Sequence, residues 1–428
     1  MFLNLLPFTI GRNILEVTLL KQTEIFGFSL FDVKYFVPLY LSDLFLLLIY
    51  QNYFSNKFFR KNTNKLKINN TLKVTLSSFS IFFVLIICRS LNHEFGNLLL
   101  FGSLIILKFF LIFALPILAI LKTDKEKDFL YQAIASITFL QIIIIFVEQF
   151  KGGNINRFIE NRLPGIEIGV RAAESINLLR SDGTFNEPNI AAIFLLMNGL
   201  WLVNFALKNW KTKNNTFFYL IIGILALFTI IFTGSRSLYA LVFCSGVFYF
   251  LKYKKTIILL LRNLWQKKIT RIIGLFFLII GLPYLLTRIH TLKNVFSSDG
   301  SLAYRQELNS HVLSLATNDF LGIGLDLTSY YLAKHFKTVD NQFTMFDQAP
   351  AHNILIQVFT ETGIFACLVF LFFIYYALKK GLIKKDNSFA IAGLAYFLAA
   401  QFHPVFTNHY ELTAFFFLYL GLSLNEKK

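Results

Sequence analysis

Long apolar stretches, separated by short polar connections, make up most of this 428-residue chain. A helix needs about 20 mostly apolar residues to cross the hydrocarbon core of a bilayer. On that scale the pattern predicts spans at residues 35–52, 74–90, 98–121, 129–150, 189–207, 216–233, 237–252, 272–287, 353–378, 388–402 and 410–424. The expected fold is therefore an all-α polytopic membrane protein with about 11–12 transmembrane helices.

The segment 1–34 fits this pattern poorly, because charged side chains interrupt its apolar runs. The interruptions are Arg12, Glu16, Lys21, Glu24 and Asp32. We predict an interfacial or partly inserted helical segment here, and whether it contains a further span stays open. The segment lacks the basic start and the small-residue cleavage site of a signal peptide.

Composition supports the membrane interpretation. The chain is 56% hydrophobic and 15% charged, whereas soluble domains carry about 25% charged residues. We interpret the 52 phenylalanines as lipid-facing bulk. The three cysteines, Cys88, Cys244 and Cys367, all lie in apolar segments and offer neither metal-ligand spacing nor a disulfide framework.

The net charge of +17 is divided among short loops, and every second loop is basic. Basic loops of membrane proteins lie in the cytoplasm. The charge is therefore a topology signal, and no nucleic acid partner is expected. The turn at Arg236 then faces outward. The four predicted parts are segment 1–34, a first bundle at 35–287 with an outward loop at 151–188, a periplasmic loop domain at 288–352, and C-terminal helices with a cytoplasmic tail at 353–428.

The polar interval 288–352 is the longest one, and it precedes the last three predicted spans. Part of it has the spacing of an amphipathic helix at the surface, with an apolar stripe at Tyr304, Leu308, Val312 and Leu315. Arg305 and Asn309 lie at the border of its polar side. Gly322 and Gly324 then end the helix, and we interpret them first as a C-cap and second as a phosphate-binding turn.

The span that follows begins with an unusual polar stripe. His352 and Asn353 open it, and Asn353, Gln357, Thr360 and Glu361 share one helical face for about two turns. Such residues are costly in lipid, so they are expected to face the bundle interior or an aqueous cavity. Hydrogen bonds between helices are the alternative explanation for Gln357 and Thr360.

Two further outward segments carry arginine. In RSDGTFNEPNIAA, at residues 180–192, Asn186 or Glu187 is suited to cap the next helix and Pro188 to its first turn. In FTGSRSLYA, at residues 232–240, Gly234 and Ser235 form a tight turn that places Arg236 at the mouth of the bundle. Arg236 either extends to lipid phosphate or binds another anionic partner.

These residues suit the chemistry of a diphosphate. Guanidinium groups bind phosphate oxygens in pairs and stay charged, and a histidine beside them is suited to accept a proton from an attacking hydroxyl. No acidic cluster of the DxD type is present in the outward segments, so arginines would take the place of a metal. No nucleotide sugar is supplied outside the inner membrane, so the donor is expected to be a lipid-linked sugar.

The chain resembles the superfamily of O-antigen ligases and Wzy-type O-antigen polymerases. The resemblance covers most of the chain and is best from Arg180 to Gly363. Its carriers are the motif at residues 180–189, TGSR at 233–236, the Arg305 helix that leads to Gly322–Gly324, and HNILIQVFTETG at 352–363. The resemblance implies metal-independent transfer of glycans from undecaprenyl diphosphate, without a cofactor, at the periplasmic face of the bacterial inner membrane.

Roles follow from the resemblance, position by position. Arg180, Arg236 and Arg305 would hold the donor diphosphate, with Arg236 and Arg305 in the catalytic set. His352 would be the base or the orienting group for the acceptor hydroxyl. The other candidate substrate-binding residues are Glu187, Asn189, Asn353, Gln357 and Glu361, of which Asn353 and Glu361 would support the His352 helix.

Three functions stay open at this point. An O-antigen ligase would transfer polymer to lipid A-core. A polymerase would join repeat units of O-antigen, capsule or exopolysaccharide on a growing glycan acceptor. A polysaccharide transporter or flippase is a more distant alternative, because the two halves of the chain show no internal repeat.

Overall fold

A computed structural model of the chain describes residues 15–20, 33–37, 51, 70–116, 124–152, 180–185, 187–210, 216–265, 301–335, 351–384, 386–406 and 409–425. The predicted span at 272–287 lies outside these residues, as does nearly all of the span at 35–52. The chain forms two compact units, which are described separately. Unit 1 contains residues 1–131 and 305–428, and unit 2 contains residues 132–304.

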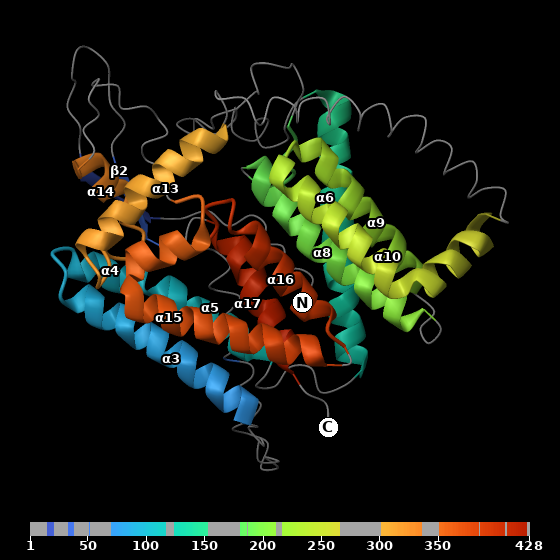
Figure 1. Ribbon diagram of the computed structural model, residues 1–428, viewed down its shortest axis with the longest axis horizontal. Coiled ribbons are helices and arrows are strands. Elements are labelled where there is room, and N and C mark those ends of the chain that lie inside the picture. The colour runs from blue at the N-terminus through green and yellow to red at the C-terminus, as the bar shows by residue number, and fades with distance from the viewer. Residues whose placement is uncertain are drawn as a thin grey trace. The chain divides into compact units, whose positions relative to one another are not determined.

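The all-α polytopic class is confirmed. Six helices among the described residues are long and apolar enough to cross a membrane, and α16 (Ser388–Ala399) and α17 (Tyr410–Leu424) are apolar but shorter. Unit 1 also contains α3 (Asn70–Leu91), α4 (Gly96–Gly102), α5 (Leu104–Leu115), α14 (Thr328–His335) and α15 (Ile354–Ile383), together with most of α13 (Ser301–Asn318) (Figure 1).

Four helices make up most of the described part of unit 2. They are most of α6 (Asp124–Lys151), and α8 (Pro188–Asn209), α9 (Thr216–Thr233) and α10 (Arg236–Trp265). Helix α8 packs along α9, and every residue from Ile190 to Leu207 is buried. Gly223 of α9 allows this close approach, because a Cβ there would lie 2.9 Å from Val203 Cγ2. Helix α10 covers the predicted span 237–252 and continues past a break at Tyr253.

The helical interpretation of the N-terminal segment is wrong where the structure describes it. Strands β1 (Leu15–Leu20) and β2 (Val33–Val37) pair antiparallel, with Leu15 opposite Val37 and Val17 opposite Tyr35. In β1, apolar and polar residues largely alternate, which is a period of two and favours a strand over a helix, and β2 is rich in aromatic and β-branched residues. The predicted span at 35–52 therefore began too early, inside β2.

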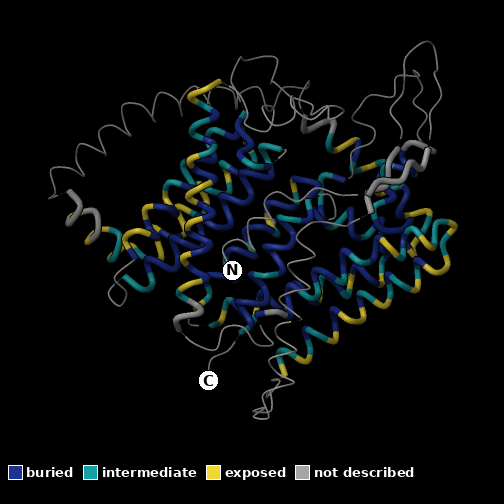
Figure 2. The backbone as a smooth tube through the Cα atoms, turned by 180° about the vertical axis from the view of Figure 1, so that it is seen from behind, coloured by how far each residue is buried: buried dark blue, intermediate teal, exposed yellow. Residues whose placement is uncertain are grey.

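A cluster of phenylalanines forms the core of unit 1. The Phe79 ring of α3 lies 5.0 Å from Phe373 of α15 and 5.4 Å from Phe417 of α17 between ring centroids. Its ring also stacks against Phe113 of α5. Figure 2 shows this buried interior behind an exposed outer face. The interpretation of phenylalanine as lipid-facing bulk is therefore wrong for these side chains, which pack against one another inside the protein.

Helix α15 is interrupted at Gly363, whose φ of 82° and ψ of 169° are not helical. In a continuous helix, Thr360 O and Glu361 O would accept from amides four residues further on. Here the connection between α13 and α14 supplies the partners instead. Ile323 N donates to Thr360 O at 2.9 Å, and Gly324 N donates to Glu361 O at 3.0 Å.

The same connection completes the exchange in the other direction, because Ile364 N donates to Phe320 O at 3.0 Å. Gly322 crosses Gly363 so closely that a Cβ on Gly322 would lie 2.5 Å from Gly363 N. The C-cap and phosphate-turn interpretations of Gly322 and Gly324 are therefore both wrong. Because of these two glycines, the backbone of the α13–α14 connection approaches α15 closely enough to replace the hydrogen bonds that the break removes.

The break also changes where the polar stripe lies. Residues 364–383 have a length of about 30 Å at 1.5 Å per residue, which is enough to cross a bilayer without the preceding turns. Arg89, in the last turn of α3, donates to Gly322 O, so the C-terminal end of α3 is level with the break. Residues 354–362 therefore extend beyond the end of α3, and how far their polar side chains run into the membrane stays a prediction.

Candidate functional site

In unit 2, the segment before α8 and the turn between α9 and α10 form one cluster. Ser181 N donates to Phe232 O at 3.1 Å, and Arg180 Nε donates to Thr233 O at 3.0 Å. The side chain of Arg180 lies over Gly234, where a Cβ would be 3.0 Å from Arg180 Nε. With a φ of +67°, Gly234 adopts the left-handed conformation that favours glycine. Two motifs that are separate in the sequence are thus brought together.

A chain of hydrogen bonds extends this cluster to the start of α8. Arg180 Nη2 donates to Asn189 Oδ1 at 3.0 Å, and Asn189 Nδ2 donates to Glu187 Oε1 at 2.9 Å. Glu187 occupies the N-cap position and Pro188 the first turn, as predicted, but the Glu187 side chain makes no capping bond. Asn186 lies outside the described residues. Arg180, Glu187 and Asn189 are therefore one connected group.

Arg236 is the first residue of α10 and is exposed beside this group. The amides of a helix N-terminus carry partial positive charge, and Arg236 adds a full one. Ser235, just before it, is 2% exposed, so the turn is tightly packed behind the charge. The half-buried Arg180 and the exposed Arg236 place two positive charges at this corner of unit 2, with the Glu187 carboxylate bonded into the same group.

Helix α6 contributes three polar residues that sequence reasoning missed. Glu148 Oε2 accepts from Gly183 N at 2.9 Å, Gln141 Oε1 accepts from Thr184 N at 3.1 Å, and Gln149 Nε2 donates to Ser181 Oγ at 2.7 Å. They hold the loop before α8 in place. The available signal was their position, because Gln141, Glu148 and Gln149 share one face of an otherwise apolar predicted span.

Arg180→Lys is expected to lower the stability of unit 2 by about 1–2 kcal/mol, although the charge is kept. A lysine cannot bond Thr233 O and Asn189 Oδ1 together with a planar fork. The measurement is thermal unfolding of the purified protein in detergent. Lys254→Arg, at an exposed position in α10, is the matched control and should leave the melting temperature unchanged. An unchanged melting temperature for Arg180→Lys would contradict a bridging role.

In unit 1, the start of α15 meets α13 and the connection between α16 and α17. His352 N donates to Asn309 Oδ1 at 3.0 Å, and Arg305 Nη1 donates to Phe402 O at 3.3 Å. Asn353 is the N-cap of α15, since its Oδ1 accepts from Leu355 N at 2.9 Å, and its Nδ2 donates to Gln401 O at 3.3 Å. Arg305, His352 and Asn353 are thus held around one connection.

Gln357 and Glu361 lie inside the protein, 0% and 1% exposed. Glu361 Oε1 accepts from Gln357 Nε2 at 3.2 Å and from Thr328 Oγ1, at the start of α14, at 3.1 Å. Thr360 Oγ1 donates to Val312 O of α13 at 3.3 Å. The predicted stripe therefore fixes the His352 segment to α13 and α14. The apolar stripe of α13 is confirmed at Leu308, Val312 and Leu315, which are all buried.

The predicted convergence of the three arginines remains a prediction. Arg180 and Arg236 belong to unit 2, whereas Arg305 and His352 belong to unit 1. Within each unit the predicted residues do gather. Among the described residues, no group of three or more His, Cys, Asp or Glu side chains is arranged to hold a metal ion.

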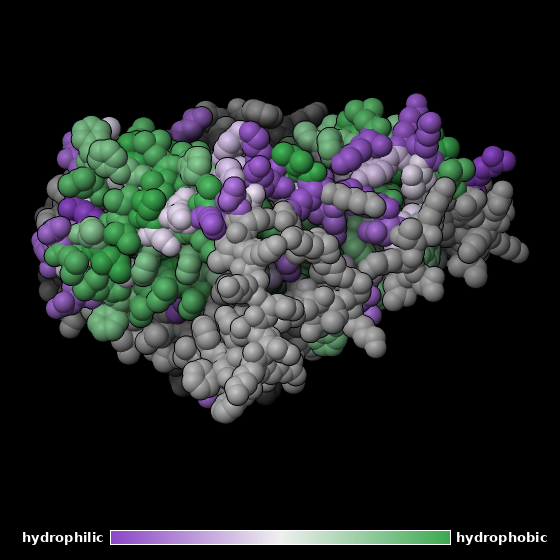
Figure 3. Space-filling model, turned by 90° about the horizontal axis from the view of Figure 1, so that it is seen from below, coloured by the Kyte–Doolittle hydropathy of each residue, from purple (hydrophilic) through white to green (hydrophobic). Residues whose placement is uncertain are grey.

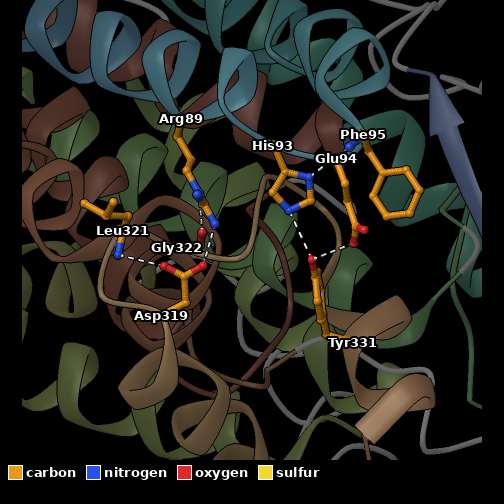
Figure 4. Close-up of polar contacts among 8 residues, drawn as sticks. All are labelled: Arg89, His93, Glu94, Phe95, Asp319, Leu321, Gly322 and Tyr331. Carbon is orange, nitrogen blue, oxygen red and sulfur yellow. Dashed lines mark hydrogen bonds and ion pairs between the residues drawn. The ribbon is translucent and has the colours of Figure 1, made fainter.

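A second polar cluster lies in the connection between α3 and α4, and sequence reasoning missed it (Figure 4). His93 Nδ1 accepts from Phe95 N at 3.1 Å, which places the proton of neutral His93 on Nε2. His93 Nε2 lies 3.1 Å from the Tyr331 hydroxyl, which donates to Glu94 Oε1 at 3.2 Å. Beside it, Arg89 forms an ion pair with Asp319. These contacts hold α14 and the α13–α14 connection on the end of α3.

Burial lowers the pKa of His93, and Arg89 lowers it further, against opposing effects of Glu94, Asp319 and the Ile323 backbone. Burial and Glu94 raise the pKa of Tyr331 to about 12, so this hydroxyl stays protonated at neutral pH. The cluster therefore stabilises the neutral form of His93. Protonation of Nδ1 would end the bond from Phe95 N.

The melting temperature is expected to fall as the pH drops below about 6.5, the ordinary pKa of histidine. Because the pKa of His93 is lower in the folded protein, the unfolded chain binds the proton more readily. The contribution of neutral His93 to the free energy of unfolding is complete above about pH 6.5. It is lost as the pH falls through the pKa of His93 in the folded protein. His93→Gln should flatten the dependence, whereas His311→Gln, at a half-exposed histidine on α13, should not. If the melting temperature depends on pH with the same slope in both variants, His93 is not the group responsible.

The middle of the chain is similar to a known protein family. Residues 221–371 match the family model described as "Wzy_C: O-Antigen ligase". Over this stretch the chain is similar to that family. The matched stretch begins within α9 and ends within α15, and it includes Arg236, Arg305 and His352. No curated protein matches the chain. The predicted resemblance to the O-antigen ligase and Wzy superfamily is confirmed over these residues, and the apolar helices among the described residues agree with a multi-pass membrane protein.

Proposed function

We propose that this protein moves a glycan polymer from undecaprenyl diphosphate to lipid A-core. The reaction would take place at the periplasmic face of the inner membrane. The observation that carries the proposal is the cluster in unit 2, where Arg180 and Arg236 flank the turn at Gly234. Gly234 and Arg236 lie in the matched region, and Arg180 precedes it in the sequence. Paired guanidinium groups at a helix N-terminus suit a diphosphate at the level of the lipid headgroups.

In the proposed reaction, an acceptor hydroxyl attacks the anomeric carbon of the donor sugar. The new bond joins the acceptor oxygen to that carbon, and the bond from carbon to diphosphate oxygen breaks. His352 accepts the hydroxyl proton, and undecaprenyl diphosphate leaves with the bonding electron pair. Arg180, Arg236 and Arg305 stabilise the charge that develops on the diphosphate, without a metal ion. Asn353, Gln357 and Glu361 keep the His352 segment in place.

His352→Ala is expected to abolish transfer while the protein still inserts into the membrane. The measurement is the lipopolysaccharide profile of a deletion strain complemented with each variant. A ligase defect leaves long polymer on the lipid carrier and bare core, whereas a polymerase defect leaves one repeat unit on core. His311→Ala, at the half-exposed α13 histidine, is the control and should restore the normal profile. Normal polymer on core with His352→Ala would contradict both enzyme assignments.

A transport function is separated by a second experiment. Purified protein in detergent, given lipid-linked glycan and acceptor, is expected to form product, because transfer needs no sealed compartment. A transporter or flippase would yield none under these conditions.

A further inference from the structure

Two neighbouring apolar side chains stand exposed on the α13–α14 connection. Phe320 is 61% exposed and Leu321 is 58% exposed. Their backbone is nevertheless fixed, because Phe320 O accepts from Ile364 N at 3.0 Å and Leu321 N donates to Asp319 Oδ1 at 3.1 Å. In Figure 4 the Leu321 side chain points away from Arg89 and His93. Hydrogen bonds therefore fix the backbone of this turn, and both side chains point outward from it.

These side chains continue a surface that faces lipid. After its break, α15 exposes one apolar stripe, with Phe365 64%, Leu368 56% and Phe372 49% exposed. Phe365 follows Ile364, to which Phe320 is bonded. Both α15 and its neighbour α3 are candidate membrane spans. Phe320 and Leu321 thus lie at the end of an exposed apolar stripe, and such a stripe on a membrane-spanning helix faces acyl chains.

Helix α3 carries a matching stripe of exposed residues, at Ile81, Val84, Cys88 and Leu91. Figure 3 views the side on which α3 lies in Figure 1, and a continuous hydrophobic area is present there. Leu91 ends this stripe two residues after Arg89, which binds Gly322 O. The exposed stripes of both helices therefore end at the turn that carries Phe320 and Leu321.

The two charged side chains beside the apolar pair form an ion pair with each other. Arg89 pairs with Asp319, the residue directly before the apolar pair. Charged groups near a bilayer core are expected to be paired in this way. Further back on α13, most exposed residues are polar, with Gln306, Glu307 and Ser310 among them, and Leu313 is an apolar exception. The polarity of the exposed side thus changes from polar along α13 to apolar at its end, which marks a boundary between water and lipid.

We propose that Phe320 and Leu321 insert into the acyl-chain region of the bilayer and anchor the α13–α14 connection in the membrane. The partner is the lipid of the surrounding leaflet. The gain comes from removing two large apolar side chains from water. This role goes beyond glycan transfer and does not depend on it.

The test places an environment-sensitive dye on single cysteines in full-length protein in lipid nanodiscs. The variants Phe320→Cys and Leu321→Cys are made on a Cys88→Ser, Cys244→Ser, Cys367→Ala background, and these changes leave the backbone bonds of the turn intact. Spin-labelled acyl chains are expected to quench both dyes as strongly as a dye on Cys88 in a reference protein that keeps this exposed cysteine and carries only Cys244→Ser and Cys367→Ala. Aqueous iodide should quench a dye on Ser310→Cys and lose its effect at the two test positions.

The proposal is overturned if iodide quenches the dye at Phe320→Cys as well as at Ser310→Cys while spin-labelled lipid does not. A second measurement uses the unaltered protein and lipids with photoreactive acyl chains. The peptide that contains Phe320 and Leu321 is expected to carry lipid adducts. A cross-link from this peptide to a second copy of the chain, in place of lipid, would also overturn the proposal.

Discussion

Gly363→Ala is expected to cost about 3 kcal/mol or more of folding free energy and to remove most properly folded protein from the membrane. At φ 82° and ψ 169°, Gly363 has a backbone conformation that is essentially restricted to glycine. A Cβ there would also lie 2.5 Å from Leu321 C and Leu321 O. Both contacts are to backbone, which cannot move away as a flexible side chain would.

The measurement is the yield and melting temperature of the detergent-solubilised protein, followed by size-exclusion chromatography. Gly246→Ala is the matched control, because a Cβ at Gly246 in α10 would meet nothing within 4 Å. Alanine there should be neutral or stabilise the helix by up to about 1 kcal/mol. If both variants melt at the wild-type temperature, the crossing of Gly322 and Gly363 does not hold unit 1 together.

Arg236→Ala is expected to reduce glycan transfer on the order of 10²-fold or more, with an unchanged melting temperature. Arg236 is exposed, so its removal should cost the fold little, whereas a charge aimed at a leaving diphosphate acts mainly in the transition state. The transfer rate of Arg236→Lys should lie between those of the wild type and Arg236→Ala, because lysine keeps the charge and loses the planar pair of donors.

Initial rates of transfer by purified protein in detergent provide the measurement. Lys254→Ala removes the same charge from an exposed position in the same helix, and it should keep nearly full activity. A similar loss in both variants would point to a general effect of net charge. Near-normal transfer by Arg236→Ala would remove this residue from the proposed catalytic set.

Much of the helical frame was predictable, because a bilayer demands long apolar runs. The predicted span 216–233 coincides with α9, and 410–424 coincides with α17. The β1–β2 pair was missed because charged residues were interpreted as interruptions of a helix instead of as one face of a strand. The break in α15 was also missed. Its cause is a hydrogen-bonding segment about 40 residues earlier in the chain, and no local pattern reports such a partner.

The candidate site was predictable to a similar extent. The contact of Arg180 with the turn at Gly234 follows the expected order of motifs, because both segments adjoin neighbouring helices. The supporting residues Glu148 and Gln149 were overlooked inside an apolar helix. Gln357 and Glu361 were assigned to substrate, yet their side chains bind protein atoms. A sequence shows that a polar residue is present, but its partner is set by packing.

The exchange of hydrogen bonds at Gly363 has a consequence for substrate entry. Lifting the α13–α14 connection would leave Thr360 O and Glu361 O without donors, and both residues are buried. The connection and the two parts of α15 should therefore open together or remain closed together, as one cooperative unit. The amides of Ile323, Gly324 and Ile364 are then expected to show the same slow hydrogen exchange. A connection bonded in this way does not swing as a lid by itself, so in the proposed reaction donor and acceptor would reach His352 by another route.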